Sequence, residues 1–89
     1  MQMTNVIIDF RRYLKRRNYS RHTVKNYLSV LKEFVIWLDV PLEQLTSQKV
    51  DEYIDYLHGK RMQAASINIY LASVRVFYRY LRHEKGIGG

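Results

Sequence analysis

Residues 20–38, with the sequence SRHTVKNYLSVLKEFVIWL, decide the fold of this chain. Their apolar side chains recur every three or four positions, which is the spacing of one stripe along an amphipathic helix. The stripe contains Val24, Tyr27, Leu28, Leu31, Phe34, Val35 and Leu38. Ser20 can cap the amino end of the helix, and Pro41 stops it soon after Leu38 because proline cannot continue a helix. The segment therefore predicts a helix between Ser20 and Leu38.

The residues before this segment predict a shorter helix from about 5 to 17. Ile7, Phe10 and Leu14 fall on one face of it. Thr4 can cap its amino end, and Asn18 can close it because asparagine tolerates the left-handed conformation.

Two further helices are predicted after a short turn at residues 41–45. Thr46 or Ser47 caps the third helix, which closes at Gly59, and the fourth runs from about 64 to 83 before Gly86 ends it. Their predicted buried faces contain Val50, Tyr53, Ile54 and Leu57 in the third helix, and Ile67, Tyr70, Leu71, Val74, Phe77, Tyr78 and Leu81 in the fourth.

A shift of 43 residues superposes residues 6–38 on 49–81, with identities such as Tyr27 on Tyr70 and Phe34 on Phe77. Either one helical hairpin occurs twice, or two unrelated hairpins share the helical period. Both interpretations predict an all-α fold, a compact four-helix domain of two helical hairpins in an orthogonal-type bundle. We expect the domain to span residues 1–85, and residues 86–89 to begin a linker or a disordered tail.

Length and composition exclude several classes of protein. Eighty-nine residues, 47% hydrophobic and 26% charged, suit one folded domain and exclude a two-domain enzyme. The absence of cysteine excludes disulfides and thiolate chemistry. No apolar run approaches the roughly 20 residues that cross a bilayer, and the first residues do not resemble a signal peptide. We therefore expect a cytoplasmic protein without a membrane partner.

The charge is strongly basic and unevenly distributed. Fifteen Lys and Arg against eight Asp and Glu leave +7, which favours a polyanionic partner such as nucleic acid or an acidic membrane face, and the charge alone does not choose between them. Residues 33–59 carry one base and six acids, whereas both flanking segments are basic. Between Asp9 and Glu33 there are eight bases and no acid: Arg11, Arg12, Lys15, Arg16, Arg17, Arg21, Lys25 and Lys32. Repulsion among these bases lowers the stability of the fold unless a bound anion neutralises their charge.

Polar side chains form two matching ridges at the same angular offset from the core stripes of the second and fourth helices. The first basic ridge contains Arg21, Lys25, Ser29 and Lys32, and the second contains Asn68, Arg75, Arg79 and Arg82. Arg and Asn suit phosphates and the guanine and adenine edges in a major groove, while Lys and Ser mainly contact phosphates. These eight residues are predicted DNA contacts, with Arg12, Lys15, Arg16 and Arg17 as secondary contacts to the DNA backbone. The alternative is a pair of solvated polar faces.

The fourth helix carries a second apolar stripe, nearly opposite its core face, formed by Ile69, Val76 and Tyr80. Either another helix of the domain covers this stripe, or it contacts another protein. These three residues are therefore candidates for a protein contact.

No cofactor, metal site or catalytic centre is expected. Asp51, Glu52 and Asp55 form an acidic cluster, which suits the amino-terminal half of a helix and supplies too few ligands for a cation. His22, His58 and His83 have no metal-binding spacing. A stand-alone enzyme is the weakest functional hypothesis, because no nucleophile is paired with a base.

Several residues together resemble a known family. They are Arg17-Asn18-Tyr19-Ser20, Thr23 and Tyr27, then Phe34 and Leu38, and later Ser66-Ile67, Leu71, Val74-Arg75, Phe77-Tyr78 and Tyr80-Leu81. Over about residues 5–85 the chain resembles the core-binding domain of tyrosine recombinases, which include phage integrases and Xer-type recombinases. Gln63, where the family often has Ser, and Gly88-Gly89, where it often has Asn-Pro, depart from the pattern.

The resemblance implies a SAM-like four-helix domain that clamps one face of a recombination core site. Its second and fourth helices would approach the major groove, a separate C-terminal catalytic domain would cut the DNA, and other protomers would assemble alongside. None of the eight tyrosines is expected to be catalytic. The leading hypothesis is sequence-preferring binding of double-stranded DNA by a non-catalytic domain. The alternative is a SAM-like protein–protein interaction domain, in which the acidic third helix and the basic first helix join protomers head to tail.

Overall fold

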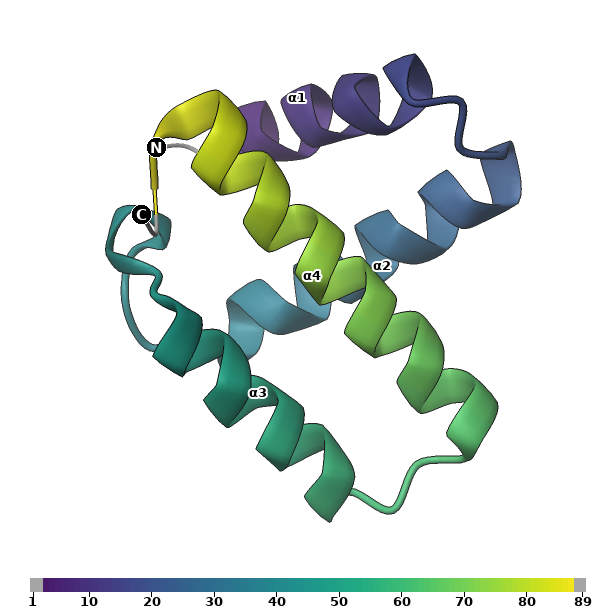
Figure 1. The fold of residues 1–89 in the computed structure, drawn as a ribbon, viewed down its shortest axis with the longest axis vertical. Helices are drawn as coiled ribbons and strands as arrows, with labels where there is room; N and C mark the ends of the chain where they lie inside the picture. The colour runs from purple at the N-terminus through teal and green to yellow at the C-terminus, as the bar shows by residue number, and fades with distance from the viewer. Residues whose placement is uncertain (1–2, 88–89) are drawn as a thin grey trace.

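Four α-helices and one short 3₁₀ helix make up residues 3–87, the part of the chain that this computed structural model describes, with side chains from residue 5 onward (Figure 1). They are α1 (Met3–Arg16), α2 (Arg21–Trp37), η1 (Leu42–Gln44), α3 (Ser47–Gly59) and α4 (Ala64–Lys85). No strand occurs between residues 3 and 87. The predicted all-α class is confirmed.

The predicted caps of three helices are confirmed. The Ser20 hydroxyl accepts a hydrogen bond from the Thr23 backbone N–H at 3.1 Å, and the Thr46 hydroxyl accepts one from Lys49 N–H at 3.3 Å. Gly86 closes α4 with a φ of 65°, in the left-handed region.

Two other predicted helix ends differ from the structure. Since α1 already begins at Met3, Thr4 lies inside the helix, and its prediction as the cap is wrong. Asn18 does adopt the left-handed conformation, with a φ of 64°. At the corresponding point after α3 it is Arg61, with a φ of 56°, and not Gly59 that turns the chain, because Gly59 is still helical.

The helix ends agree with a repeated hairpin. Arg21 and Ala64, the first residues of α2 and α4, are 43 residues apart. The same separation relates Arg16 and Gly59, which end α1 and α3, and also Asn18 and Arg61, the two left-handed residues. The shift that aligns the sequence thus aligns the helix boundaries.

The two hairpins, α1–α2 and α3–α4, pack across each other. In Figure 1, α4 crosses in front of α2, with α1 beyond them at the top and α3 at the lower left. Both α2 and α4 begin at the right-hand side of this view and run toward the left. This crossing confirms the predicted orthogonal-type bundle, and it places α2 and α4 face to face at its centre.

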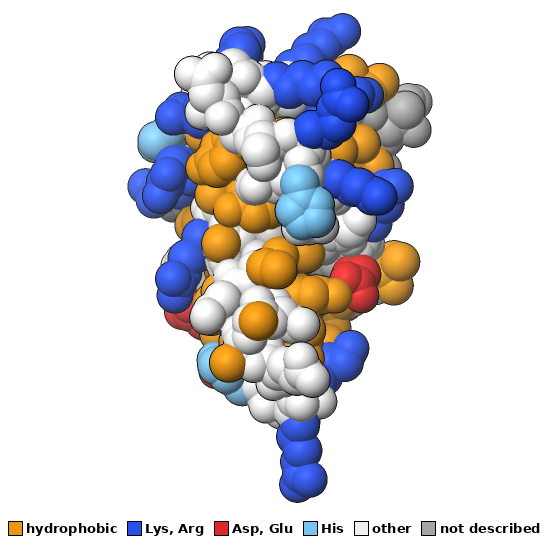
Figure 2. Space-filling view, turned by 90° about the vertical axis from the view of Figure 1, so that its right-hand side faces the viewer, with side chains coloured by type: hydrophobic (Ala, Val, Ile, Leu, Met, Phe, Trp, Pro, Cys, Tyr) orange, Lys and Arg blue, Asp and Glu red, His pale blue; other side chains and the backbone are white. Residues whose placement is uncertain are grey.

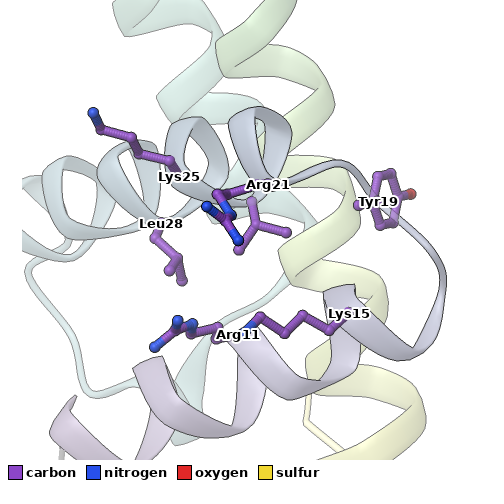
Figure 3. Close-up of a pocket in the computed structure, with 7 residues that line it drawn as sticks. Arg11, Lys15, Tyr19, Arg21, Lys25 and Leu28 are labelled. Atoms are coloured by element: carbon purple, nitrogen blue, oxygen red, sulfur yellow. The ribbon is translucent and has the colours of Figure 1, made fainter.

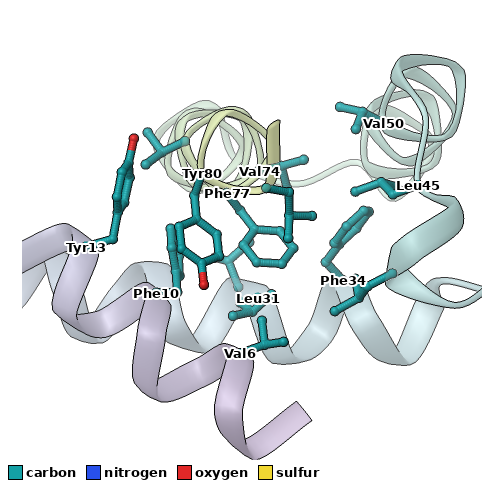
Figure 4. Close-up of a cluster of buried hydrophobic side chains, with 14 of the residues drawn as sticks. Val6, Phe10, Tyr13, Leu31, Phe34, Leu45, Val50, Val74, Phe77 and Tyr80 are labelled. Carbon is teal, nitrogen blue, oxygen red and sulfur yellow. The ribbon is translucent and has the colours of Figure 1, made fainter. Parts of the chain in front are cut away.

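An aromatic cluster fills the space between α1, α2 and α4 (Figure 4). The ring of Phe77 lies 5.1 Å from Phe10 and 6.3 Å from Phe34, measured between centroids. Both pairs meet edge to face, which is one of the favoured geometries for aromatic pairs. On α1 the buried partner of Phe10 is Val6, whereas the predicted Ile7 is only half-buried.

The second apolar stripe of α4 is covered from within the domain. Tyr80 is 2% exposed and its ring lies 5.3 Å from Phe10 and 5.2 Å from Tyr13, both on α1. Val76 is 9% exposed. The prediction of Val76 and Tyr80 as protein contacts is therefore wrong, because α1 packs on this side of α4. Ile69, at 40% exposure, is the one stripe residue that lies on the surface.

The packed domain continues past the predicted boundary at residue 85. Ile87 is buried, and its backbone N–H donates to the Leu81 carbonyl at 3.0 Å, which completes the helix cap. The predicted tail at Gly88-Gly89 lies outside the described residues. Between residues 3 and 87, no helix has the length and apolar character needed to cross a membrane.

Candidate nucleic-acid interface

All eight predicted DNA contacts are exposed, but the two ridges face different neighbours. Arg21 and Lys25 of the first basic ridge border α1, whereas Arg75, Arg79 and Arg82 of the second border α3. The cause is the pairing of helices within each hairpin, because the ridge on α2 lies beside α1 and the ridge on α4 lies beside α3. The two ridges thus border different helices, and their contact with DNA stays a prediction.

A cleft of about 550 Å³ separates α1 from α2. The α1–α2 cleft is lined by Arg11, Lys15, Tyr19, Arg21, Val24, Lys25 and Leu28. In Figure 3 the Arg11 and Lys15 side chains lie along the side of α1 that faces α2, and Arg21 reaches toward them from α2. Lys25 extends away from α1 at the rim, while Leu28 points into the cleft. Charged walls thus surround a partly apolar floor.

The α1–α2 cleft has four bases and no carboxylate in its lining. Among the side chains of residues 5–87, no ion pair joins any of these four bases to an acid. Elsewhere in the same range bases do pair: Arg16 with Glu84 at 3.2 Å, Lys85 with Asp9 at 3.1 Å, and Lys49 with both Asp39 and Glu52. The α1–α2 cleft therefore has a strongly positive electrostatic potential.

The α3–α4 groove, with a volume of about 300 Å³, is the second basic hollow. It is lined by Val50, Arg75, Tyr78, Arg79, Arg82 and His83, again without a carboxylate. The Arg82 guanidinium lies 5.9 Å from the centroid of the Tyr78 ring. Ser29, Lys32 and Asn68, the remaining ridge residues, are exposed but line neither this groove nor the α1–α2 cleft.

The predicted secondary contacts on α1 divide into three environments. Lys15 lies in the α1–α2 cleft. Arg12 and Arg16 line another hollow that also holds Asp9 and Glu84, so acids offset their charge. Arg17 lies over the Tyr13 ring, with its guanidinium carbon 4.4 Å from the centroid.

The predicted DNA contacts do not include Arg11, although the structure places it in the α1–α2 cleft. One signal could have found it. Arg11 and Lys15 are four residues apart, so they share one side of α1.

Figure 2 shows the face on which α2 and α4 begin. Lys and Arg gather at its upper end and along both sides, with hydrophobic and uncharged side chains between them and little acidic surface. On this face too, positive charge borders a central strip that carries little charge.

Within residues 3–87, no group of three or more His, Asp or Glu side chains could hold a metal ion. Asp51, Glu52 and Asp55 of the acidic cluster are exposed on α3.

Four tyrosines have pKa values above the ordinary value for this side chain. The pKa of Tyr70 is raised to about 12, mainly by its hydrogen bond to Glu33, and burial raises that of Tyr80 to about 12. Burial also raises the pKa of Tyr27 and Tyr53.

Residues 7–85 match the family model described as the N-terminal SAM-like domain of phage integrase. The chain is 38% identical to tyrosine recombinase XerC of Syntrophus aciditrophicus over 97 residues, which cover 96% of this chain and 31% of that protein. It is 34% identical to the TnP I resolvase of Bacillus thuringiensis over 86% of this chain and 29% of the resolvase. XerC of Bacillus licheniformis is 29% identical over 91% of this chain and 28% of its own length.

The chain thus spans about a third of the length of the curated relatives it matches. No solved structure matches it. The family match covers nearly all of the packed helices, from α1 to the end of α4. The predicted SAM-like fold and the resemblance to Xer-type recombinases are confirmed, and the chain belongs to the family of N-terminal SAM-like domains of phage integrases.

Proposed function

We propose that this domain binds double-stranded DNA, with a preference for a recombination core site, as the non-catalytic part of a tyrosine recombinase in DNA integration and site-specific recombination. One observation carries the proposal: the α1–α2 cleft and the α3–α4 groove together hold seven bases and no lining carboxylate. Protein surfaces that bind a phosphate backbone have this character. The recombinase names of the relatives agree with a DNA substrate.

In this proposal the bases of both ridges mainly contact phosphates, and two residues of the second ridge read bases. Asn68 and Arg75 are suited to adenine and guanine edges, because they can make paired hydrogen bonds. Ser29 and Lys32 would add phosphate contacts along α2. Phosphate contacts position the domain, whereas base contacts provide its sequence preference.

The absence of catalysis is supported by the tyrosines. A tyrosine nucleophile needs a neighbouring base or a lowered pKa, whereas the pKa values of Tyr27, Tyr53, Tyr70 and Tyr80 are raised. The cutting of DNA would then belong to a C-terminal catalytic domain of the parent protein, with other protomers as partners on the DNA. The proposal involves no cofactor and places the domain in the cytoplasm with its DNA.

The test is the salt dependence of binding to a fluorescent duplex, followed by anisotropy. Five to seven phosphate contacts should give a slope of about −5 to −6 in a plot of log K against log salt, since each contributes about 0.9. Competition with mutated core sites then measures the sequence preference. A flat response to salt would contradict the proposal.

A second candidate function, protein interaction, is favoured by one surface. An aromatic groove between α2, α3 and α4 is lined by Trp37, Tyr53, Tyr56 and Tyr70, and Ile36 beside it is 85% exposed. The acidic cluster of α3 lies on a helix that borders this groove. Association that grows with protein concentration in the absence of DNA, measured by analytical ultracentrifugation, would favour this function.

A further inference from the structure

We propose that the α1–α2 cleft seats one stretch of the DNA phosphate backbone, with Arg11 and Lys15 on one wall and Arg21 and Lys25 on the other. The inference rests on the proposed DNA binding. It adds Arg11 to the predicted contacts and makes α1 one wall of the site instead of a source of secondary contacts. The resemblance assigned the approach to DNA to the second and fourth helices. Here the first helix supplies half of the charge that surrounds the cleft.

The first support is the electrostatic cost of the arrangement. Arg11 and Lys15 are four residues apart on α1, as are Arg21 and Lys25 on α2, and like charges at this spacing destabilise a helix. The cleft then brings the two pairs to the same hollow with no acid in its lining. A bound polyanion relieves this repulsion, whereas solvent only screens it.

The second support is an internal control that the repeat provides. The second hairpin has the same helix boundaries 43 residues later, and there the four positions hold Ile54, His58, Ala64 and Asn68. None of these four residues is a lysine or an arginine. A hairpin of this geometry therefore folds without the four bases, so their presence in the first hairpin points to a ligand.

The third support is the chemistry of the walls and the floor. Guanidinium groups can donate two parallel hydrogen bonds to a phosphate, and the Arg21 side chain points from α2 toward the α1 side of the cleft (Figure 3). Val24 and Leu28 provide apolar surface in the cleft, and Tyr19 lies at its end, on the turn between α1 and α2. This combination suits a sugar-phosphate chain, which presents anionic oxygens and sugar carbons in alternation.

The experiment measures binding of a fluorescent random-sequence duplex by Arg11→Gln and Lys15→Gln across a range of salt. Each variant should weaken binding about three- to tenfold and make the salt slope less steep by about 0.9, the value for one phosphate. Lys60→Gln is the matched control: it removes the same charge from a side chain that lies over Tyr56, outside both basic hollows. It should change affinity less than twofold. Circular dichroism confirms the fold of every variant.

Each other outcome overturns the proposal in a recognisable way. An equal loss in Lys60→Gln would show that the bases act only through net charge. A loss in Arg79→Gln, with none in Arg11→Gln or Lys15→Gln, would place the DNA at the α3–α4 groove and leave the proposed function intact. Salt-independent or absent binding by the unaltered domain would instead contradict the proposed function itself.

An acidic protein segment could also occupy a basic cleft. Polyglutamate of matched charge tests this occupant in the same assay. If Arg11→Gln and Lys15→Gln lose polyglutamate binding but keep DNA binding, the cleft is a protein-docking site and the phosphate proposal is wrong. If they lose DNA binding while polyglutamate competes poorly, the phosphate proposal is supported.

Discussion

Replacement of Tyr80 by alanine should destabilise the isolated domain strongly. The Tyr80 side chain is 2% exposed, and its ring lies 5.2 Å from Tyr13, 5.3 Å from Phe10 and 6.1 Å from Phe77. Removal of a buried aromatic ring costs about 3–5 kcal/mol, because apolar burial is lost and a cavity remains. Small domains have unfolding free energies of about 5–15 kcal/mol, so at the lower end of this range Tyr80→Ala removes more than half of the total.

Tyr80→Phe separates the ring from its hydroxyl. Among the described residues the Tyr80 hydroxyl is buried without a hydrogen-bond partner, and burial raises its pKa to about 12. A buried polar group without a partner contributes a desolvation penalty. The phenylalanine variant should therefore keep the unfolding free energy or increase it by up to about 1 kcal/mol.

Urea denaturation followed by circular dichroism measures both effects, with Ile69→Ala as a control on the exposed part of the same stripe. That control should lose about 1 kcal/mol or less, as is usual for surface positions. If Tyr80→Ala lost no more than the control, with an unchanged denaturant slope, the stripe would not be part of the core. The protein-contact interpretation of Tyr80 would then return.

Three further predictions test the caps, the tyrosines and the basic cleft. Gln63→Ser should raise the unfolding free energy by about 0.5–1 kcal/mol in urea denaturation, because Gln63 makes no side-chain cap bond where the repeat has Ser20. The raised pKa of Tyr70 stabilises the fold below pH 10.0, and this contribution is lost as the pH rises toward about 12. Tyr70→Phe should therefore weaken the alkaline decline in thermal stability. The double variant Arg21→Ala and Lys25→Asn, which introduces the residues of the second hairpin, should raise stability by about 0.2–0.5 kcal/mol. In the anisotropy assay, it should also make the salt slope less steep by about 1.8. A loss of stability in Gln63→Ser would contradict the first prediction, and a steeper alkaline decline in Tyr70→Phe would contradict the second. An unchanged salt slope in the double variant would contradict the third.

The sequence predicts the helices well because local rules determine them. The 3.6-residue period places α2 and α4, and the hydroxyl caps Ser20 and Thr46 depend only on neighbouring residues. The prediction at Thr4 is wrong because α1 starts two residues earlier than its apolar pattern indicates. Arg61 adopts a conformation that residue type alone would assign to glycine or asparagine.

The site is less predictable because it depends on how helices pack. Helical angles correctly place Arg21 and Arg75 beside their core stripes, and both are exposed. The angles do not say which helix packs beside each ridge, and in the structure α1 borders the ridge on α2 while α3 borders the ridge on α4. The grouping of Arg11 with Arg21 likewise requires the hairpin geometry.

The closure of α1 against the last turn of α4 has a mechanical consequence. Lys85 pairs with Asp9 and Glu84 pairs with Arg16, so two ion pairs tie the end of α4 to both halves of α1, while Ile87 is held in the core. A pulling force on the chain just after Gly86 would act on these two ion pairs before it acted on the central contact between α2 and α4. The first helix to shift under such a force would be α1, which also carries Arg11 and Lys15. The width of the α1–α2 cleft would then change with the force.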